Sequence, residues 1–147
     1  MVTILLLDIA NAFPNAVTSH LLLNMQWLGY PMAVIKIFSA MLEDRHTSLA
    51  FDGFKSGEIN IDNGIGQGDP SSMILYLIYS YALVAIPTTM GGDGGAYVDD
   101  NLFTAHGNDF SECNLKINWM LDAQDNWSMA HNSHAELTKF KCLHLTR

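Results

Sequence analysis

The feature that most constrains this chain is an apolar stretch from Met73 to Ile86, which Ser80 alone interrupts and which holds no charged residue. It is shorter than the roughly 20 residues that a membrane-spanning helix needs. Because such a stretch must be removed from water, we expect it to form a buried core helix. The chain has 147 residues, of which 49% are apolar and 15% charged, and this suits one folded domain built around that helix.

Apolar residues at helical spacing predict three further helices, at Asn15–Leu28, Met32–Leu42 and Phe110–Met129. Asp69 and Pro70 are typical of the N-cap and first residue of the long apolar helix. We expect that helix to end before Pro87, because proline cannot donate the backbone hydrogen bond that continues a helix.

Short apolar runs predict strands at Val2–Leu7, His46–Phe51, Glu58–Ile61, Ala96–Val98, Asn101–Ala105 and Lys141–Thr146. The first run is continuous and predicts a strand that is buried on both faces. Asp52-Gly53 lies in the turn of a hairpin, and the glycines from Gly91 to Gly95 predict a mobile turn. The order of these elements favours an α+β sheet with helices on one face.

Three acidic residues stand at the ends of predicted strands. Asp8 follows the first strand, and Asp99 and Asp100 lie together between two later ones. A carboxylate beside a buried sheet is costly without a cation, and no Lys or Arg is close to these three in sequence. Mg²⁺ prefers such oxygen ligands, so the pattern is typical of a magnesium site. Adjacent Asp residues are also ordinary turn residues, and by themselves Asp99 and Asp100 favour that structural explanation.

The segments around the acids resemble the polymerase motifs of reverse transcriptases. Leu7–Pro14 (LDIANAFP) resembles motif A, Gly64–Ser72 (GIGQGDPSS) motif B and Ala96–Asp100 (AYVDD) motif C. His131–Ser133 and Glu136–Lys139 resemble the motif D region of LINE-type, non-LTR retrotransposons, those of fungi in particular. The resemblance covers nearly the whole chain. It departs from the family at Met73, where many relatives have a second proline after the serine.

This resemblance implies that residues 1–147 form a polymerase palm, an antiparallel sheet with helices packed on one face and a ferredoxin-like core. It implies that the fingers and thumb are largely missing. The activity would be RNA-directed DNA polymerisation, in which a primer 3′-hydroxyl attacks the α-phosphate of a deoxynucleotide. Two Mg²⁺ ions, or Mn²⁺ in their place, would be the cofactors. An RNA template, a DNA primer and a dNTP would be the partners, with no role for a membrane.

The resemblance also implies individual roles. Asp8, Asp99 and Asp100 would be catalytic and would bind the metal ions, and Lys139 would act near the leaving pyrophosphate. Phe13 would exclude a 2′-hydroxyl and so select deoxynucleotides, although a plain core aromatic is the alternative. The other substrate-binding positions would be Ile9, Gln67, Gly68, Tyr97 and Val98. A solvated surface lysine is the alternative for Lys139.

Charge limits what this chain does alone. Seven Lys and Arg against fifteen Asp and Glu give a net charge of −8, whereas a self-sufficient nucleic-acid binder has a basic surface. We therefore expect weak or no nucleic-acid binding by the chain alone. Cys113 and Cys142 have neither metal-ligand nor disulfide spacing, which favours a reducing compartment inside the cell and leaves open whether it is nuclear or cytoplasmic.

Two alternatives to an active enzyme stay open. One is a catalytically inactive retrotransposon remnant that does not bind a template. The other is an unrelated acidic binding module with accidental motifs, which predicts that Asp8 lies far in space from Asp99 and Asp100. His131 and His134 are spaced like two metal ligands, but structural zinc needs four, so a loop or capping role is favoured.

Overall fold

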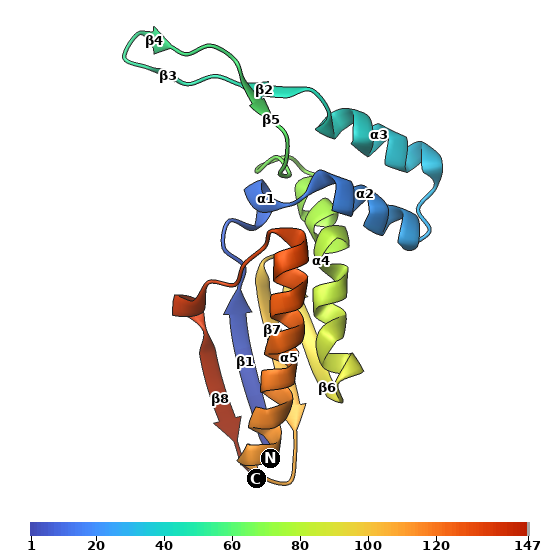
Figure 1. The fold of residues 1–147 in the computed structure, drawn as a ribbon, viewed down its shortest axis with the longest axis vertical. Helices are drawn as coiled ribbons and strands as arrows, with labels where there is room; N and C mark the ends of the chain where they lie inside the picture. Colours follow the sequence, from blue (N-terminus) through green and yellow to red (C-terminus); the bar gives the residue numbers. More distant parts are fainter. Residues whose placement is uncertain (147) are drawn as a thin grey trace.

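The computed structural model describes residues 1–146, which form an α+β domain (Figure 1). Its main sheet has four antiparallel strands in the order β6-β7-β1-β8. Helices α4 (Ser72–Thr89) and α5 (Phe110–His131) pack against this sheet, and both lie on the same face of it in Figure 1. The predicted α+β class with helices on one face is therefore confirmed.

Strand β1 (Val2–Asp8) lies in the middle of the sheet, between β7 (Asp100–His106) and β8 (Lys141–Leu145). Its side chains alternate: Thr3, Leu5 and Leu7 are buried under the helices, whereas Leu6 is 43% exposed. The prediction of a strand buried on both faces is wrong, because no helix covers the second face in the described part of the chain. Asp8 falls on that open face together with Leu6, since residues two apart share a face.

Helix α4 is the predicted core helix. Tyr76, Tyr79 and Leu83 are fully buried, although by length and hydropathy alone this helix could also cross a membrane. It continues through Pro87 to Thr89, so the predicted end before the proline is wrong. Only Thr88 and Thr89 follow Pro87 in the helix, so the proline stands at its very end, and it is itself buried.

The start of α4 also differs from the prediction. Asp69 is not the N-cap, because the helix begins at Ser72 with Ser71 as its cap. The Asp69 carboxylate instead accepts a hydrogen bond of 2.7 Å from the backbone N–H of Ser71. The Asp69 carboxylate therefore has its hydrogen-bond partner in a local turn that precedes the helix.

The glycine-rich segment after α4 is a strand, β6 (Gly92–Tyr97), where the sequence predicts a mobile turn. Close packing explains the glycines. A Cβ at Gly92 would lie 2.0 Å from the Thr104 carbonyl oxygen, and one at Gly94 would lie 2.8 Å from the Val84 carbonyl oxygen. Strand β7 leaves no room for a side chain at Gly92, and helix α4 leaves none at Gly94, so only hydrogen fits at these positions.

Between β1 and α4 the chain forms α1 (Ala12–Asn15), α2 (Thr18–Trp27), α3 (Met32–Leu42) and an arm that projects from the body in Figure 1. The arm contains β2 (Arg45–Thr47) paired with β5 (Ile59–Ile61), and β3 (Ala50–Phe51) paired with β4 (Phe54–Lys55). Its tip turns at Asp52-Gly53, as predicted. The helix predicted at Asn15–Leu28 is α2, which begins only at Thr18, because the chain leaves the helical conformation at Ala16 after the short, unpredicted α1.

Helix α5 begins with a cap formed by residues that lie close together in the sequence. The Asp109 carboxylate accepts a hydrogen bond of 2.8 Å from the Glu112 N–H, and Glu112 in turn accepts one of 2.9 Å from the Asn108 N–H. After α5, a single 3₁₀ turn, η1 (Leu137–Lys139), leads into β8, the predicted last strand.

Candidate active site

Asp8 is directly opposite Asp100 in the β1–β7 ladder. Directly opposite residues of an antiparallel pair project from the same face of a sheet, so both acids belong to the open face. The separation in space that an unrelated binding module predicts is therefore absent. The Asp8 side chain is 14% exposed, and its Oδ2 accepts a hydrogen bond of 2.8 Å from Lys139 Nζ.

Asp99 lies in the tight turn between β6 and β7, because Tyr97 and Asp100 are paired and Val98 has a left-handed φ of 60°. The Asp99 carbonyl oxygen accepts two hydrogen bonds, 3.1 Å from the Ile9 N–H and 2.9 Å from Asn101 Nδ2. The turn is thus fastened to the residue that follows Asp8, which fixes the two acids relative to each other.

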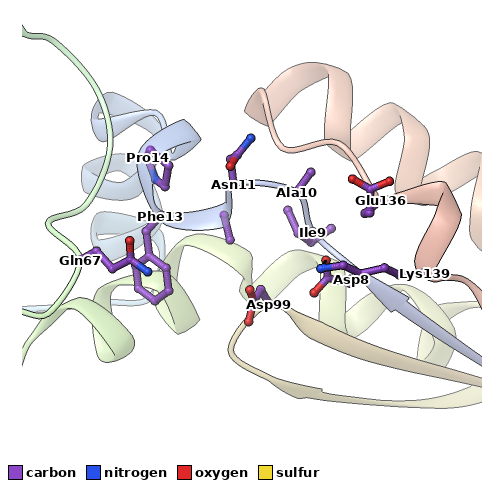
Figure 2. A pocket seen from close by; sticks show the side chains of 11 residues that line it. Asp8, Ile9, Ala10, Asn11, Phe13, Pro14, Gln67, Asp99, Glu136 and Lys139 are labelled. Atoms are coloured by element: carbon purple, nitrogen blue, oxygen red, sulfur yellow. Dashed lines mark hydrogen bonds and ion pairs between the residues drawn. The ribbon is translucent and has the colours of Figure 1, made fainter.

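A pocket of about 290 Å³ opens where β1, the β6–β7 turn and η1 meet. Figure 2 shows the Asp8 and Asp99 carboxylates close together in it, with the Lys139 side chain reaching Asp8. Of the residues with an expected role, this pocket is lined by Asp8, Ile9, Phe13, Gln67, Asp99 and Lys139. Segments more than 100 residues apart in the sequence thus form one site.

Phe13 and Gln67 form the other side of this pocket in Figure 2. The loop that carries Gln67 is held to α1 by a hydrogen bond of 2.8 Å from the Ile65 N–H to the Phe13 carbonyl oxygen. Gly64 is required there, because it has a φ of 90° and its Cβ would lie 2.7 Å from the Pro14 carbonyl oxygen. The Phe13 ring rests on Tyr76, with ring centroids 5.2 Å apart.

The remaining expected residues lie outside this pocket. Asp100 lines a neighbouring pocket of about 470 Å³ together with Asp8 and Lys139. Tyr97 is 77% exposed at the end of β6, Val98 packs on the core, and Gly68 precedes α4. Among residues 1–146, no three His, Cys, Asp or Glu side chains converge on one point that a metal ion could occupy.

The donor set nevertheless fits a hard divalent cation. The carboxylates of Asp8 and Asp99 line one polar pocket, which Glu136 lines as well, and Mg²⁺ is commonly held by one or two carboxylates with phosphate and water completing its shell. The Lys139 ammonium, which pairs with Asp8, occupies the place that a metal cation would take at this carboxylate. Asp8 and Asp99 are the residues that would hold the ion, and Asp100 is one peptide away.

Sequence reasoning assigned no role to Glu136, Asn101 or Tyr76. Glu136 lines the pocket, and its N–H donates a 2.8 Å hydrogen bond to the Asp8 carbonyl oxygen. Asn101 is buried and steadies the Asp99 turn, and its position next to the two acids was a signal that could have found it. Burial and the Asp99 carboxylate raise the pKa of the buried Tyr76 hydroxyl, which therefore stays neutral below the site.

The two histidines considered as metal ligands do not form a metal site. His131 ends α5 and packs on aromatic rings, stacked on Trp127 with ring centroids 4.6 Å apart and edge-on to Tyr79 and His20. His134 is exposed, and its carbonyl oxygen accepts a 2.9 Å hydrogen bond from the Ala10 N–H. The predicted loop or capping role thus holds for the backbone of His134 and for the partly buried His131, whose Nδ1 lies 2.9 Å from the Trp127 carbonyl oxygen in the last turn of α5.

The His131 environment makes stability depend on pH. Burial lowers the pKa of the His131 imidazole, and the neighbouring His20 lowers it further, although a hydrogen bond to the Trp127 carbonyl opposes this. The unfolded chain, with a histidine pKa near 6.5, therefore binds the proton first as the pH falls. We expect the free energy of unfolding to be highest above about pH 6.5 and to fall below it.

Urea unfolding at pH 7.5 and 5.5 checks this expectation. The His131→Phe variant should lose less stability over this interval than the wild type, because its ring cannot be protonated. His46→Gln is the control, since His46 is exposed on the arm. An equal loss in the wild type and in His131→Phe would contradict the assignment.

No protein-family model and no curated protein sequence matches this chain. Solved structures do. Apo telomerase from Candida tropicalis, truncated from its C-terminal domain, has a TM-score of 0.76 at 12% identity over 99% of this chain and 31% of that one. Telomerase from Candida albicans in complex with a TWJ fragment of telomeric RNA has a TM-score of 0.76 at 11% identity, over 99% of this chain and 27% of that one. Telomerase from Candida tropicalis with the same kind of RNA fragment has a TM-score of 0.68 at 11% identity, over 97% of this chain and 26% of that one.

These matches correct the expected lineage. The similar structures are telomerases, and neither a family model nor a curated sequence supports a LINE-type, non-LTR retrotransposon, so that prediction is wrong. The motifs are short, and short motifs do not distinguish one lineage of a fold from another. At this identity the likeness concerns the fold. The chain spans less than a third of the telomerase chains and has the fold of that part of them.

Proposed function

We propose that this chain is the palm of a reverse-transcriptase-related polymerase and that it carries the site for transfer of deoxynucleotides to a primer 3′-hydroxyl. The observation that carries the proposal is the pocket shared by Asp8 and Asp99, two acids that come from distant parts of the chain. The order β6-β7-β1-β8, with helices between β1 and β6 and between β7 and β8, supports a ferredoxin-like core for such a palm.

Each residue of the pocket has a role in this proposal. Asp8 and Asp99 hold divalent cations, which when bound lower the pKa of the attacking hydroxyl and stabilise charge on the phosphate. Asp100 extends this set from the neighbouring pocket, and Lys139, which lines both pockets, acts near the leaving pyrophosphate. These residues position the reactants, and a site of this kind gains most of its rate from such fixed charges.

Phe13 is the proposed selector for deoxynucleotides. Its ring lies on the pocket wall beside Gln67 and is backed by the buried Tyr76, so it cannot retreat from a bulkier sugar without displacing the core. Ile9, Gly68, Tyr97 and Val98 stay proposed substrate contacts, with Tyr97 exposed beside Asp100 where a primer end would lie.

The experiment that tests the proposal is extension of a labelled DNA primer on an RNA template. The chain is fused to the flanking segments of a reverse transcriptase, because the matched telomerase chains are more than three times as long. Extension that requires Mg²⁺ or Mn²⁺ and uses dNTPs in preference to rNTPs is the expected result. Lack of extension by the fusion, with a functional palm extending under the same conditions, would overturn it.

The nucleic-acid partner of the proposal is an RNA template with a DNA primer, in line with the telomerases that were solved with telomeric RNA. Because the chain has a net charge of −8, we expect it to bind a primer–template weakly when it is alone. Fluorescence anisotropy with a labelled RNA–DNA duplex at physiological salt measures this, and submicromolar binding would contradict the charge argument.

A second candidate is a non-catalytic domain of the same fold. The observation that favours it is that three carboxylates do not converge among residues 1–146. Metal-dependent extension by the fusion separates the two candidates, since only the first predicts product.

A further inference from the structure

The two side chains of the Lys139–Asp8 ion pair differ in solvent exposure. The Asp8 side chain is 14% exposed, whereas that of Lys139 is 61% exposed, and Nζ lies 2.8 Å from Oδ2. Both residues line both pockets of the candidate site. The ammonium therefore comes from the solvent side and occupies a carboxylate oxygen that faces the pocket.

Backbone hydrogen bonds hold the segment that carries Lys139 beside Asp8. Ile9 and Ala135 form an isolated antiparallel bridge, and the Glu136 N–H donates to the Asp8 carbonyl oxygen at 2.8 Å. These bonds tie the start of the segment to the end of β1. Lys139 follows on the single turn η1, so it is tethered near Asp8 while its exposed side chain keeps the freedom to leave.

An ammonium and a divalent cation compete for the same carboxylate oxygen, because both bind to the lone pairs of that oxygen. The two positive charges also repel each other. We propose that Lys139 is a tethered counter-ion of Asp8 that a divalent cation must displace, so that metal binding and the Lys139–Asp8 pair exclude each other. This inference rests on the proposed function, since it takes Asp8 as a metal ligand.

The displaced lysine has a second acidic partner. Glu136 lines the same pocket, and its charge already acts on Lys139. The hydrogen bond to Asp8 and its charge raise the pKa of Lys139, with a smaller contribution from Glu136, so Lys139 stays charged at neutral pH. Metal entry at Asp8 therefore turns the Lys139 ammonium away from Asp8 and toward Glu136.

The test is a titration of the full chain with Mn²⁺, in which the concentration of free Mn²⁺ is measured by electron paramagnetic resonance. We expect Lys139→Met to bind Mn²⁺ about fivefold more tightly than the wild type, the factor that a modest ion pair represents. Lys139→Arg keeps the pair and should bind like the wild type. Lys141→Met is the matched control, because Lys141 lines the second pocket and its loss changes the net charge equally.

Thermal unfolding gives a second readout. Mg²⁺ should raise the Tm of Lys139→Met more than that of the wild type or of Lys141→Met, since bound ligand stabilises according to its affinity. Equal Mn²⁺ affinities for Lys139→Met and Lys141→Met, with binding still lost in Asp8→Asn, would overturn this inference and leave the proposed function standing. Absence of binding to both wild type and Lys139→Met, or binding that Asp8→Asn does not weaken, would overturn both.

Discussion

Asparagine in place of Asp99 is expected to lower metal-dependent primer extension by about a thousandfold or more. The change keeps the size of the side chain and removes its charge. Stabilisation of the transition state by a bound metal amounts to several kcal/mol, and each 1.4 kcal/mol is a factor of ten in rate. Because Asp99 lines the pocket from the β6–β7 turn, its neutralisation removes one of the two carboxylates proposed to hold the metal.

The control for this variant is Asp93→Asn, which neutralises an exposed acid on the same hairpin. It should extend primers like the wild type. Circular dichroism must show both variants folded, since the Asp99 carbonyl, which accepts the Ile9 and Asn101 hydrogen bonds, is unchanged by the substitution. Extension by Asp99→Asn at more than a tenth of the wild-type rate would be incompatible with a metal-ligating role.

Alanine at Gly92 is expected to cause the largest loss of stability. Its Cβ would lie 2.0 Å from the Thr104 carbonyl oxygen and 2.7 Å from Met120 Cε. The methionine can move, but the carbonyl belongs to the neighbouring strand, so β6 must separate from β7. Overpacking of this kind costs about 3 kcal/mol or more, which lowers the Tm of a domain of this size by roughly 6–12 °C.

Gly95→Ala is the matched control on the same strand, because a Cβ there meets nothing within 4 Å. Its Tm should stay within a few degrees of the wild type, measured by differential scanning calorimetry. If Gly92→Ala were as stable as Gly95→Ala, the close approach of β6 to β7 at this point would be wrong.

The two positions, Asp99 and Gly92, differ in how much the sequence alone indicates about them. Asp8 and Asp99 were identifiable because a carboxylate at the end of an apolar strand needs a partner, whatever the fold. Gly92 was not, because a glycine-rich run has the same local signature in a mobile turn and in a strand packed closely against its neighbours. The difference lies in Thr104, which is distant in sequence.

The same division applies to β1 and to Lys139. A run of apolar residues from Val2 to Leu7 predicts a strand, but its burial on one face only depends on where α4 and α5 pack. Lys139 was a candidate from its motif, yet a surface lysine was an equal alternative. The bridge between Ile9 and Ala135, which no local pattern encodes, brings it to Asp8.

The sequence by itself determined the α+β class, the core helix around Tyr79 and the turn at Asp52-Gly53, and it singled out the acidic residues of the candidate site. These follow from side-chain chemistry and short-range spacing. Only the tertiary structure decided that Asp8 and Asp99 share a pocket while Asp100 lies in the next one, and that Lys139 already neutralises Asp8. Register, sheet face and ion pairing depend on contacts between residues far apart in the chain, so they emerge only when the whole domain has packed.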